Sequence, residues 1–301
     1  MVYTVIRIPK DKFTYRFSKD IPPAAYAKPG DVVVFEVTDN LSGQIKSEDI
    51  PLEAIDISKR NPCTGPLYVE GVQPGDTLVV SILDIRISNR GWIRVFPGGG
   101  ALHDKVFEPK IKIVSIEDDY VIFGNIKIPI KPMVGTIGVA PADGEIPTVM
   151  CGPHGGNIDL KIVRRGCRLY FPVFTDGALL AMGDLHAVQS DGESGITPVE
   201  VEGEVMVKVD VIKGRRPTYP VVETEEYYAI VTSGKDLDEA VYKAVEESVR
   251  VLMKTFNISF QEAYMLSSIL VELRINQVVN PLRGARAEIS KSYVGIKAFL
   301  H

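Results

Sequence analysis

The sequence predicts an α+β fold, in which a β-rich body is followed by a C-terminal helix pair. Up to residue 234, short alternating or apolar segments are separated by Gly and Pro residues, a pattern typical of strands and turns. From residue 235, apolar residues recur at the spacing of amphipathic helices. We therefore expect residues 1–234 to form sandwich-like or barrel-like sheets that carry the functional site. Residues 235–301 are expected to pack on this body as a helical segment.

Six segments of the body have the length and composition of strands. In chain order they are DVVVFEV (31–37), DTLVVSILDI (76–85), KIKIVSI (110–116), YVIFGNIKI (120–128), CRLYFPVF (167–174) and VEGEVMVKVDVI (201–212). The N-terminal stretch 1–17 also alternates and is predicted to form a strand. A turn of Pro, Gly and Asp precedes both of the first two segments. This likeness leaves open a body built from two related, intimately packed subdomains.

The first predicted helix covers residues 236–256. Its sequence, DLDEAVYKAVEESVRVLMKTF, places apolar residues three and four positions apart on one side and charged residues on the other. Asp236 followed by Glu239 three residues later is the arrangement of a capping box, which marks the start of a helix. We expect this helix to lay its apolar side on the sheets.

The second predicted helix covers residues 259–279. Ser259 and Glu262 repeat the capping arrangement, and Pro281 ends the pattern. Because this segment is apolar over most of its circumference, we expect it to be deeply packed. The remaining residues, 280–301, leave room for a strand that returns to the sheet.

Charge and hydropathy exclude several classes of partner. The formal net charge of -5 argues against nucleic acid, which needs a basic face. No apolar run approaches the roughly 20 residues of a membrane helix, and the N-terminus lacks the pattern of a signal peptide. The three cysteines have no C-x-x-C spacing, which fits a reducing compartment. We expect a cytoplasmic protein that binds a small molecule.

A dense polar cluster follows the apolar segment LYFPVFTDGALLAM. The cluster GDLHAVQSDGE spans residues 183–193 and contains three carboxylates and one imidazole. If the chain stays extended past Gly183, Asp184 and His186 point to the same side and both reach one metal ion. Glu193 returns after a Ser-Asp-Gly turn and completes the group. The plain alternative is a loop whose side chains bond the backbone.

A second cluster has the same character. CGPHGGNIDL spans residues 151–160 and places His154, Asn157 and Asp159 among three glycines, directly before an apolar stretch. Glycines allow a backbone to approach a ligand closely and to adopt conformations that other residues resist. Two of the four histidines of the chain therefore lie in turns that are rich in Gly and carboxylates.

A third polar group follows the predicted strand at 31–37. In EVTDNLSGQI (36–45), Asp39 begins an Asx-type turn that Gly43 closes, which is the simpler interpretation. In the alternative, the Asp39 carboxylate reaches the same pocket as the two clusters. Binding residues are often placed on loops at strand ends, so Asp39 is kept as a candidate.

Five blocks carry a resemblance to a known family. They are GPLYVEGVQPGD, GTIGVAPADGEIPT, PHGGNIDL, LYFPVFTDGALLAMGDLHAVQSDGE and EVEGEVMVKVDV, within the range from about 38 to 211. In this order they resemble the acetamidase/formamidase family of metal-associated amide hydrolases. The resemblance implies hydrolysis of formamide or acetamide to ammonia and the carboxylate. It also implies a cytoplasmic homo-oligomer, a homodimer or a multiple of dimers, with a β-rich body and a helical segment.

Two family motifs can be placed on the chain. GGN-x-D falls on Gly155, Gly156, Asn157 and Asp159. GD-x-HA-x-Q-x-DGE falls on Gly183, Asp184, His186, Ala187, Gln189, Asp191, Gly192 and Glu193. Ser190 stands where the family more often has Gly.

The chemistry that the resemblance implies assigns a role to each candidate residue. A divalent metal ion is expected, with zinc first and calcium or manganese as alternatives. Such an ion lowers the pKa of bound water from ~15.7 to near 7 and polarises a carbonyl. The predicted metal ligands are Asp159, Asp184 and His186, with Asp39 as a further candidate. Glu193 is the predicted proton shuttle, and His154, Asn157 and Gln189 are predicted to orient the substrate or the oxyanion.

Two other interpretations stay open at this point. Cys151 in VMCGPHGG could act as a thiolate nucleophile with His154 nearby. Its plain alternative is a small buried residue at a strand end, the more common place for a cysteine. Outside enzymes, the chain could be a member of the family that binds a metal or small molecule without catalysis.

Overall fold

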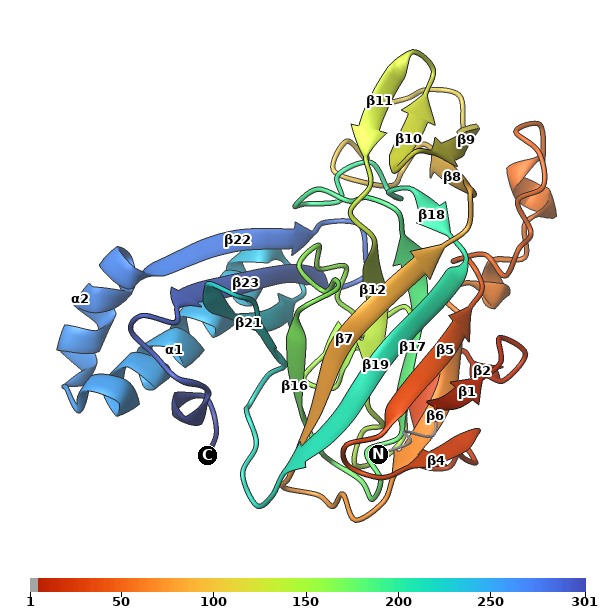
Figure 1. Ribbon diagram of the computed structural model, residues 1–301. Helices are drawn as coiled ribbons and strands as arrows, with labels where there is room; N and C mark the ends of the chain where they lie inside the picture. Colours follow the sequence, from red (N-terminus) through yellow and green to blue (C-terminus); the bar gives the residue numbers. More distant parts are fainter. Residues whose placement is uncertain (1–4) are drawn as a thin grey trace.

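The computed structural model describes residues 5–301 and shows two large sheets that pack face to face (Figure 1). One hydrophobic cluster includes Phe35 and Leu78 from the first sheet and Ile137 and Leu185 from the second, so the main core lies between the sheets. Two α-helices lie in the C-terminal part of the described chain, and the last two strands follow them. The predicted α+β class, a β-rich body followed by two helices, is confirmed.

Within residues 5–301, the first sheet has nine strands. Their spatial order is β1 (Val5–Ile8), β5 (Val32–Val37), β19 (Gly203–Ile212), β7 (Thr77–Ile87), β16 (Arg168–Pro172), β20 (Val221–Glu223), β21 (Tyr227–Gly234), β23 (Arg283–Ser290) and β22 (Val271–Gln277). The β1–β5 pair is parallel and the other neighbours are antiparallel. Because β22 and β23 come from the C-terminal segment, this sheet continues across the boundary predicted at residue 235.

The second sheet has twelve strands in the part of the chain that the structure describes. Its main order is β11 (Ile126–Pro129), β10 (Tyr120–Phe123), β9 (Lys110–Glu117), β8 (Arg90–Val95), β18 (Glu200–Val201), β17 (Leu180–His186), β12 (Met133–Gly138), β15 (Gly155–Asn157) and β14 (Cys151–Gly152). Strand β6 (Cys63–Val69) pairs with β17, and β2 (Phe13–Thr14) and β4 (Ala25–Ala27) pair with β6. A separate two-stranded sheet joins β3 (Arg16–Ser18) and β13 (Glu145–Pro147).

Helix α1 (Leu237–Phe256) follows the sequence prediction closely. The Asp236 side chain accepts a hydrogen bond from the backbone N–H of Glu239, and Asn257 ends the helix in the left-handed conformation. Val251 packs with Ile230 of β21 and Ile289 of β23 in one cluster, so α1 covers this part of the first sheet. No helix within residues 5–301 combines the length and apolar character that a membrane span requires.

Helix α2 (Phe260–Leu270) differs from the prediction in its length and packing. Its capping box at Ser259 and Glu262 forms as expected. The prediction that the helix runs to residue 279 is wrong, because the chain leaves the helix after Leu270 and pairs with β23 as strand β22. The expected deep packing is also wrong. Within α2 only Ala263 and Ser267 are buried, since the helix lies at the edge of the molecule and contacts α1 through a narrow stripe.

Candidate metal centre and pocket

Three neighbouring strands of the second sheet bring the two polar clusters together. Strand β12 lies between β17 and β15, so Thr136 is opposite both Gly183 and Asn157. Asp184 and His186 lie at the end of β17, and Asp159 follows β15 by two residues. One ligand atom from each of Asp159, Asp184 and His186 lies within 4.8 Å of the other two, and all three residues are buried. The structure therefore contains a candidate metal-binding triad.

Gly135 of β12 makes the space at the centre of this triad. A Cβ atom at this position would lie 2.5 Å from Oδ1 of Asp159, 2.8 Å from Oδ2 of Asp184 and 2.8 Å from Cε1 of His186. These distances are shorter than van der Waals contacts, so any other residue would push the triad apart. Because Gly135 has no side chain, a space remains between the three triad residues, in which an ion can bind.

The backbone is strained at three carboxylates of the site. The φ angles of Asp159, Asp184 and Glu193 are +39°, +61° and +42°. Residues other than Gly rarely adopt positive φ, and such conformations persist where the surrounding structure holds them in place, often at functional sites. Asp184 therefore does not continue a regular strand, and its backbone kink directs the carboxylate toward Asp159.

Hydrogen bonds from two distant asparagines hold the Asp184 carboxylate. Nδ2 of Asn40 lies 2.7 Å from Oδ1, and Nδ2 of Asn61 lies 3.2 Å from Oδ2. Oγ1 of Thr136 is 3.1 Å from Oδ2. Burial acts to raise the pKa of Asp184, but the charge of His186 and these hydrogen bonds outweigh it and lower the pKa below its usual value. Asp184 is therefore held as a carboxylate.

Gln189 sets the tautomer of His186. The Nε2 amide of Gln189 donates to the backbone carbonyl of Asp159 at 2.7 Å, so its Oε1 is the atom that faces Nδ1 of His186 at 2.8 Å. Since Oε1 only accepts, Nδ1 carries a hydrogen. Nε2 then faces the carboxylates, 3.4 Å from Asp184 Oδ1 and 3.6 Å from Glu200 Oε1. Burial acts to lower the pKa of His186, but the charges of Glu200 and Asp184 outweigh it and raise the pKa to about 10, so the ring is charged beside these carboxylates. A cation at Nε2 would displace this proton and take the lone pair, as metal binding to histidine requires.

Several buried polar atoms of the site have no hydrogen-bond partner among residues 5–301. They are Oδ1 of Asp159, Nε2 of His186, Oε2 of Glu193 and Oε2 of Glu200. Buried polar groups are normally paired, and buried charges are paired or coordinate metals. A divalent cation between these atoms would satisfy both requirements, so the donor set fits a metal ion.

Crowding of the carboxylates shifts their pKa values. Burial first, and then the charge of Asp184, raises the pKa of Asp159 to about 7. Burial and the neighbouring carboxylates raise the pKa of Glu193 well above its usual value. The pKa of Glu200 is raised mainly by burial, although the charge of His186 opposes it. Perturbed carboxylates of this kind, gathered at one cavity, are typical of functional sites.

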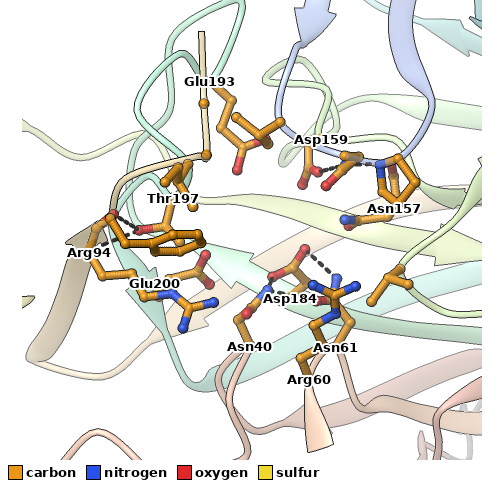
Figure 2. Close-up of a pocket in the computed structure, with 18 of the residues that line it drawn as sticks. Asn40, Arg60, Asn61, Arg94, Asn157, Asp159, Asp184, Glu193, Thr197 and Glu200 are labelled. Atoms are coloured by element: carbon orange, nitrogen blue, oxygen red, sulfur yellow. Dashed lines mark hydrogen bonds between the residues drawn. The ribbon is translucent and has the colours of Figure 1, made fainter. Parts of the chain in front are cut away.

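The triad opens into a cavity of about 370 Å³. Figure 2 shows Asp159, Asp184, Glu193 and Glu200 around this space, with Arg94 beside Glu200. The wall is completed by polar, arginine and apolar residues from several elements, among them Asn40, Arg60, Asn61, Phe96, Asn157, Ile196, Thr197, Val279, Asn280 and Arg283. The cavity is large enough for a small polar molecule beside the triad.

The loop between β22 and β23 also reaches the site. Nδ2 of Asn280 lies 2.6 Å from Oδ2 of Asp159 and 3.2 Å from the backbone oxygen of Asn157. Asn280 therefore orients the Asp159 carboxylate and leaves its Oδ1 toward the triad. The C-terminal hairpin thus forms one wall of the pocket.

Two other sequence candidates lie outside the triad. Oδ1 of Asp39 accepts hydrogen bonds from the backbone N–H groups of Leu41 (3.0 Å) and Gly43 (2.8 Å), which is the Asx-type turn considered above. The His154 ring is buried and packs edge-on against Phe17, with the centroids of the two rings 5.1 Å apart. Neither residue is among the described residues that line the cavity. Their roles as a metal ligand and a substrate-orienting group stay predictions.

Cys151 lies on the far side of β15 from the cavity. It lines a separate, narrow space with Val231 and Ser233, and its Sγ lies 3.8 Å from the backbone oxygen of Leu282. Burial raises the pKa of the thiol to about 12. A nucleophilic cysteine needs a lowered pKa and access to the substrate, so the structure favours the plain interpretation of Cys151 as a buried packing residue.

Sequence reasoning missed several residues of the site. Glu200, Asn40, Asn61, Thr136, Gly135 and Asn280 come from five separate parts of the chain. Only Glu200 has a local signal, because it interrupts the apolar pair Val199 and Val201 in a strand-like segment. The others join the site through strand pairing, which no local pattern reports.

Comparison with known proteins identifies the family of the chain. The model of the Acetamidase/Formamidase family matches residues 6–150 and 142–282. The chain belongs to the acetamidase/formamidase family. It is 27% identical to a formamidase of Methylophilus methylotrophus, over 79% of this chain and 77% of the relative. It is 30% identical to an acetamidase of Mycolicibacterium smegmatis, over 68% and 67%.

A solved structure of the acetamidase/formamidase family has the same fold. The crystal structure of an acetamidase from Bacillus halodurans matches with a TM-score of 0.94 and 40% identity, over 96% of this chain and 98% of that chain. The family predicted from the sequence motifs is confirmed, and with it the prediction of an amide-hydrolysing enzyme.

Proposed function

We propose that the protein hydrolyses a small linear amide, formamide or acetamide, to ammonia and the carboxylate, with a divalent metal ion held by Asp159, Asp184 and His186. One observation carries the proposal: a buried triad, in which Oδ1 of Asp159 and Nε2 of His186 lack hydrogen-bond partners within residues 5–301, faces a cavity rich in carboxylates and arginines. The family and the activities named for its relatives support the same substrate class.

Zinc is the metal that we propose for this site. Two carboxylates and one imidazole are a ligand set that suits zinc in a hydrolase and leaves a position for water. When bound, such an ion supplies an activated water and polarises the amide carbonyl. Calcium, which prefers oxygen ligands, and manganese are the alternatives that elemental analysis separates.

Glu193 is the residue that we propose to move the proton. Its Oε2 has no hydrogen-bond partner among the described residues, and the side chain lines the cavity. Burial and the neighbouring carboxylates raise the pKa of Glu193, which favours the protonated carboxyl that a departing nitrogen needs. Glu200 has a similar environment across the cavity, so variants of both are needed to separate their roles.

The remaining residues hold the site in place. Gln189 orients His186, and Asn280 orients Asp159. Asn157 lines the cavity, and we keep the proposal that its amide contacts the substrate or the oxyanion. The guanidinium groups of Arg60 and Arg94 also line the cavity and supply positive charge for the carboxylate product.

We further propose a cytoplasmic homodimer or a multiple of dimers. The three cysteines are free and buried, which fits a reducing compartment. The apolar side chains that α2 leaves exposed support self-association.

Ammonia release from formamide and acetamide tests the proposed activity. We expect turnover of at least one of them, and loss of turnover in Asp184→Asn at an unchanged fold. Equal rates for the variant and the parent protein would overturn the assignment of Asp184. Absence of turnover with both amides, in protein shown to contain metal, would overturn the proposed substrate class.

A further inference from the structure

Strand β22 forms an open edge of the nine-stranded sheet. It is the last strand in the sheet order, after β23, and lies with α2 at one extreme of the molecule (Figure 1). At the C-terminal end of β22 the edge is already paired, because the backbone N–H of Gly192 donates to the carbonyl of Asn276 and the N–H of Val278 donates to the carbonyl of Gly192. Residues 271–275 have no strand partner on this side within the part of the chain that the structure describes. Proteins usually protect such edges, because the free backbone groups pair readily with another strand.

Exposed apolar side chains lie on this edge and on the helix that precedes it. Leu273 and Ile275 of β22 are 43% and 39% exposed, and Met265 and Ile269 of the adjoining helix α2 are 69% and 75% exposed. Exposed apolar side chains, where they form one patch, mark protein interaction sites. The exposed apolar side chains of β22 and α2 therefore fit a surface that is buried in a protein–protein contact.

The sequence of the edge is complementary to itself. In an antiparallel pair of two β22 strands centred on Leu273, Glu272 of each copy lies opposite Arg274 of the other, and Val271 lies opposite Ile275. Within the chain, the residues directly opposite have the same charge, because Glu272 pairs in register with Glu288 and Arg274 with Arg286. Arg274 also reaches Glu288 diagonally, 3.0 Å from Nε to Oε2. A second copy supplies the opposite charges that the chain lacks directly across β22.

We infer that two copies of this chain pair antiparallel along residues 271–275 of β22 and join their nine-stranded sheets into one. The arrangement is two-fold symmetric, so each copy presents the same surface to the other. Helix α2 ends where β22 begins, so its exposed side chains adjoin one end of the seam. The inference identifies the contact surface of the homo-oligomer proposed above and does not depend on which amide is hydrolysed.

The pairing has a consequence for the pocket. β22 and β23 are the two arms of the hairpin whose loop carries Asn280 to the Asp159 carboxylate. Fixing β22 between β23 and a second copy would therefore hold a wall of the site. Dimer formation is in this way coupled to the position of a residue that orients a metal ligand.

Charge reversal at the edge tests the inference through molar mass. We expect the parent protein to have twice the mass of one chain, or an even multiple, in multi-angle light scattering. Glu272→Arg and Arg274→Glu each place like charges opposite each other, so each variant alone should have half the parent mass. An equimolar mixture of the two restores both pairs of opposite charge and should recover the parent mass.

Controls separate this contact from other surfaces and from unfolding. Ile126→Lys alters an exposed apolar residue on β11, the edge strand of the other sheet, and should leave the mass unchanged. Leu273→Lys disrupts the centre of the seam without touching Arg274 or Glu288, and should halve the mass while circular dichroism stays that of the parent. A monomeric parent protein, an odd-numbered oligomer, or a dimer that all three β22 variants leave intact would overturn the inference. Because mass is measured without substrate, this result is independent of the proposed activity.

Discussion

Gln189 accepts from Nδ1 of His186 at 2.8 Å while its own amide nitrogen donates to the backbone carbonyl of Asp159. One side chain therefore fixes both the ring tautomer of one predicted ligand and the backbone position of another. Partners of this kind set the orientation and basicity of metal-binding histidines. The relationship explains why a residue that does not line the cavity matters for the site.

Replacement of Gln189 by Leu should weaken metal binding. The variant removes the acceptor that keeps Nδ1 protonated, and loss of such a partner typically costs about 10–100-fold in metal affinity. Competition with a chelator of known affinity measures the change. Gln189→Glu keeps the acceptor oxygen and should lose less affinity than Gln189→Leu. Equal affinities for Gln189→Leu and the parent protein would show that the tautomer does not depend on this contact.

Replacement of Gly135 by Ala should expel the metal. The new methyl group would lie 2.5–2.8 Å from atoms of all three triad residues, so the triad must spread. We expect metal affinity to fall by a factor of about 10–100 or more, as for loss of a supporting contact, and turnover to fall with it. Gly195→Ala is the matched control, because a Cβ there meets no atom within 4 Å among the described residues. A metal-replete, fully active Gly135→Ala protein would contradict the proposed position of the ion.

Replacement of Glu193 by Gln should lower kcat while the metal stays bound. The amide keeps the shape of the side chain but has no carboxyl proton to transfer, and a positioned acid or base contributes about 10²–10⁴-fold to rate. Steady-state kinetics with elemental analysis of the same sample measure both quantities. Glu200→Gln, made in parallel, distinguishes the two buried acids. A larger loss of kcat in Glu200→Gln than in Glu193→Gln would move the proton-transfer role to Glu200.

His154 should make the protein less stable as pH falls below neutrality. Burial lowers the pKa of its ring to about 4, so the folded protein keeps it neutral while the unfolded chain takes up a proton below about 6.5. The contribution of neutral His154 to the free energy of unfolding is therefore fully present above pH 6.5 and is lost as the pH falls from 6.5 to 4. Between pH 7 and pH 5 this amounts to about 2 kcal/mol.

The variant His154→Phe isolates this contribution. Other titrating groups are common to both proteins, so the variant should lose about 2 kcal/mol less unfolding free energy than the parent between pH 7 and pH 5. Urea unfolding at the two pH values measures the difference, and equal losses would contradict the assignment.

The rate of the same variant at pH 7 tests the predicted role of His154 in orienting the substrate. A fall in kcat/KM with unchanged metal content would support that role.

Local pattern was sufficient for most of the fold. Segments such as 31–37 and 201–212 alternate clearly and form β5 and β19. The end of α2 was not predictable in this way, because Val271, Leu273 and Ile275 suit a strand as well as the apolar side of a helix, and no Gly or Pro marks the boundary. Pairing with β23 decides between the two, and that pairing is a tertiary effect.

The site was predictable only in part, for a related reason. Asp159, Asp184 and His186 stand in two short clusters that combine Gly with acids and histidine, and the sheet brings these clusters together. Asn61 lies 123 residues from Asp184 in sequence and contacts it through the fold alone. Asp39 shows the converse, since its carboxylate bonds the backbone of its own turn.

Metal content and turnover measured on one sample decide whether the triad holds a catalytic metal ion. Protein purified without added metal or an affinity tag is analysed by elemental mass spectrometry, and ammonia release from formamide and acetamide is followed before chelation, after chelation and after metal is restored. We predict close to one zinc ion per chain, loss of ammonia release on chelation and its recovery with zinc. Metal-free protein that releases ammonia at an undiminished rate would show that the reaction does not need a metal ion at Asp159, Asp184 and His186.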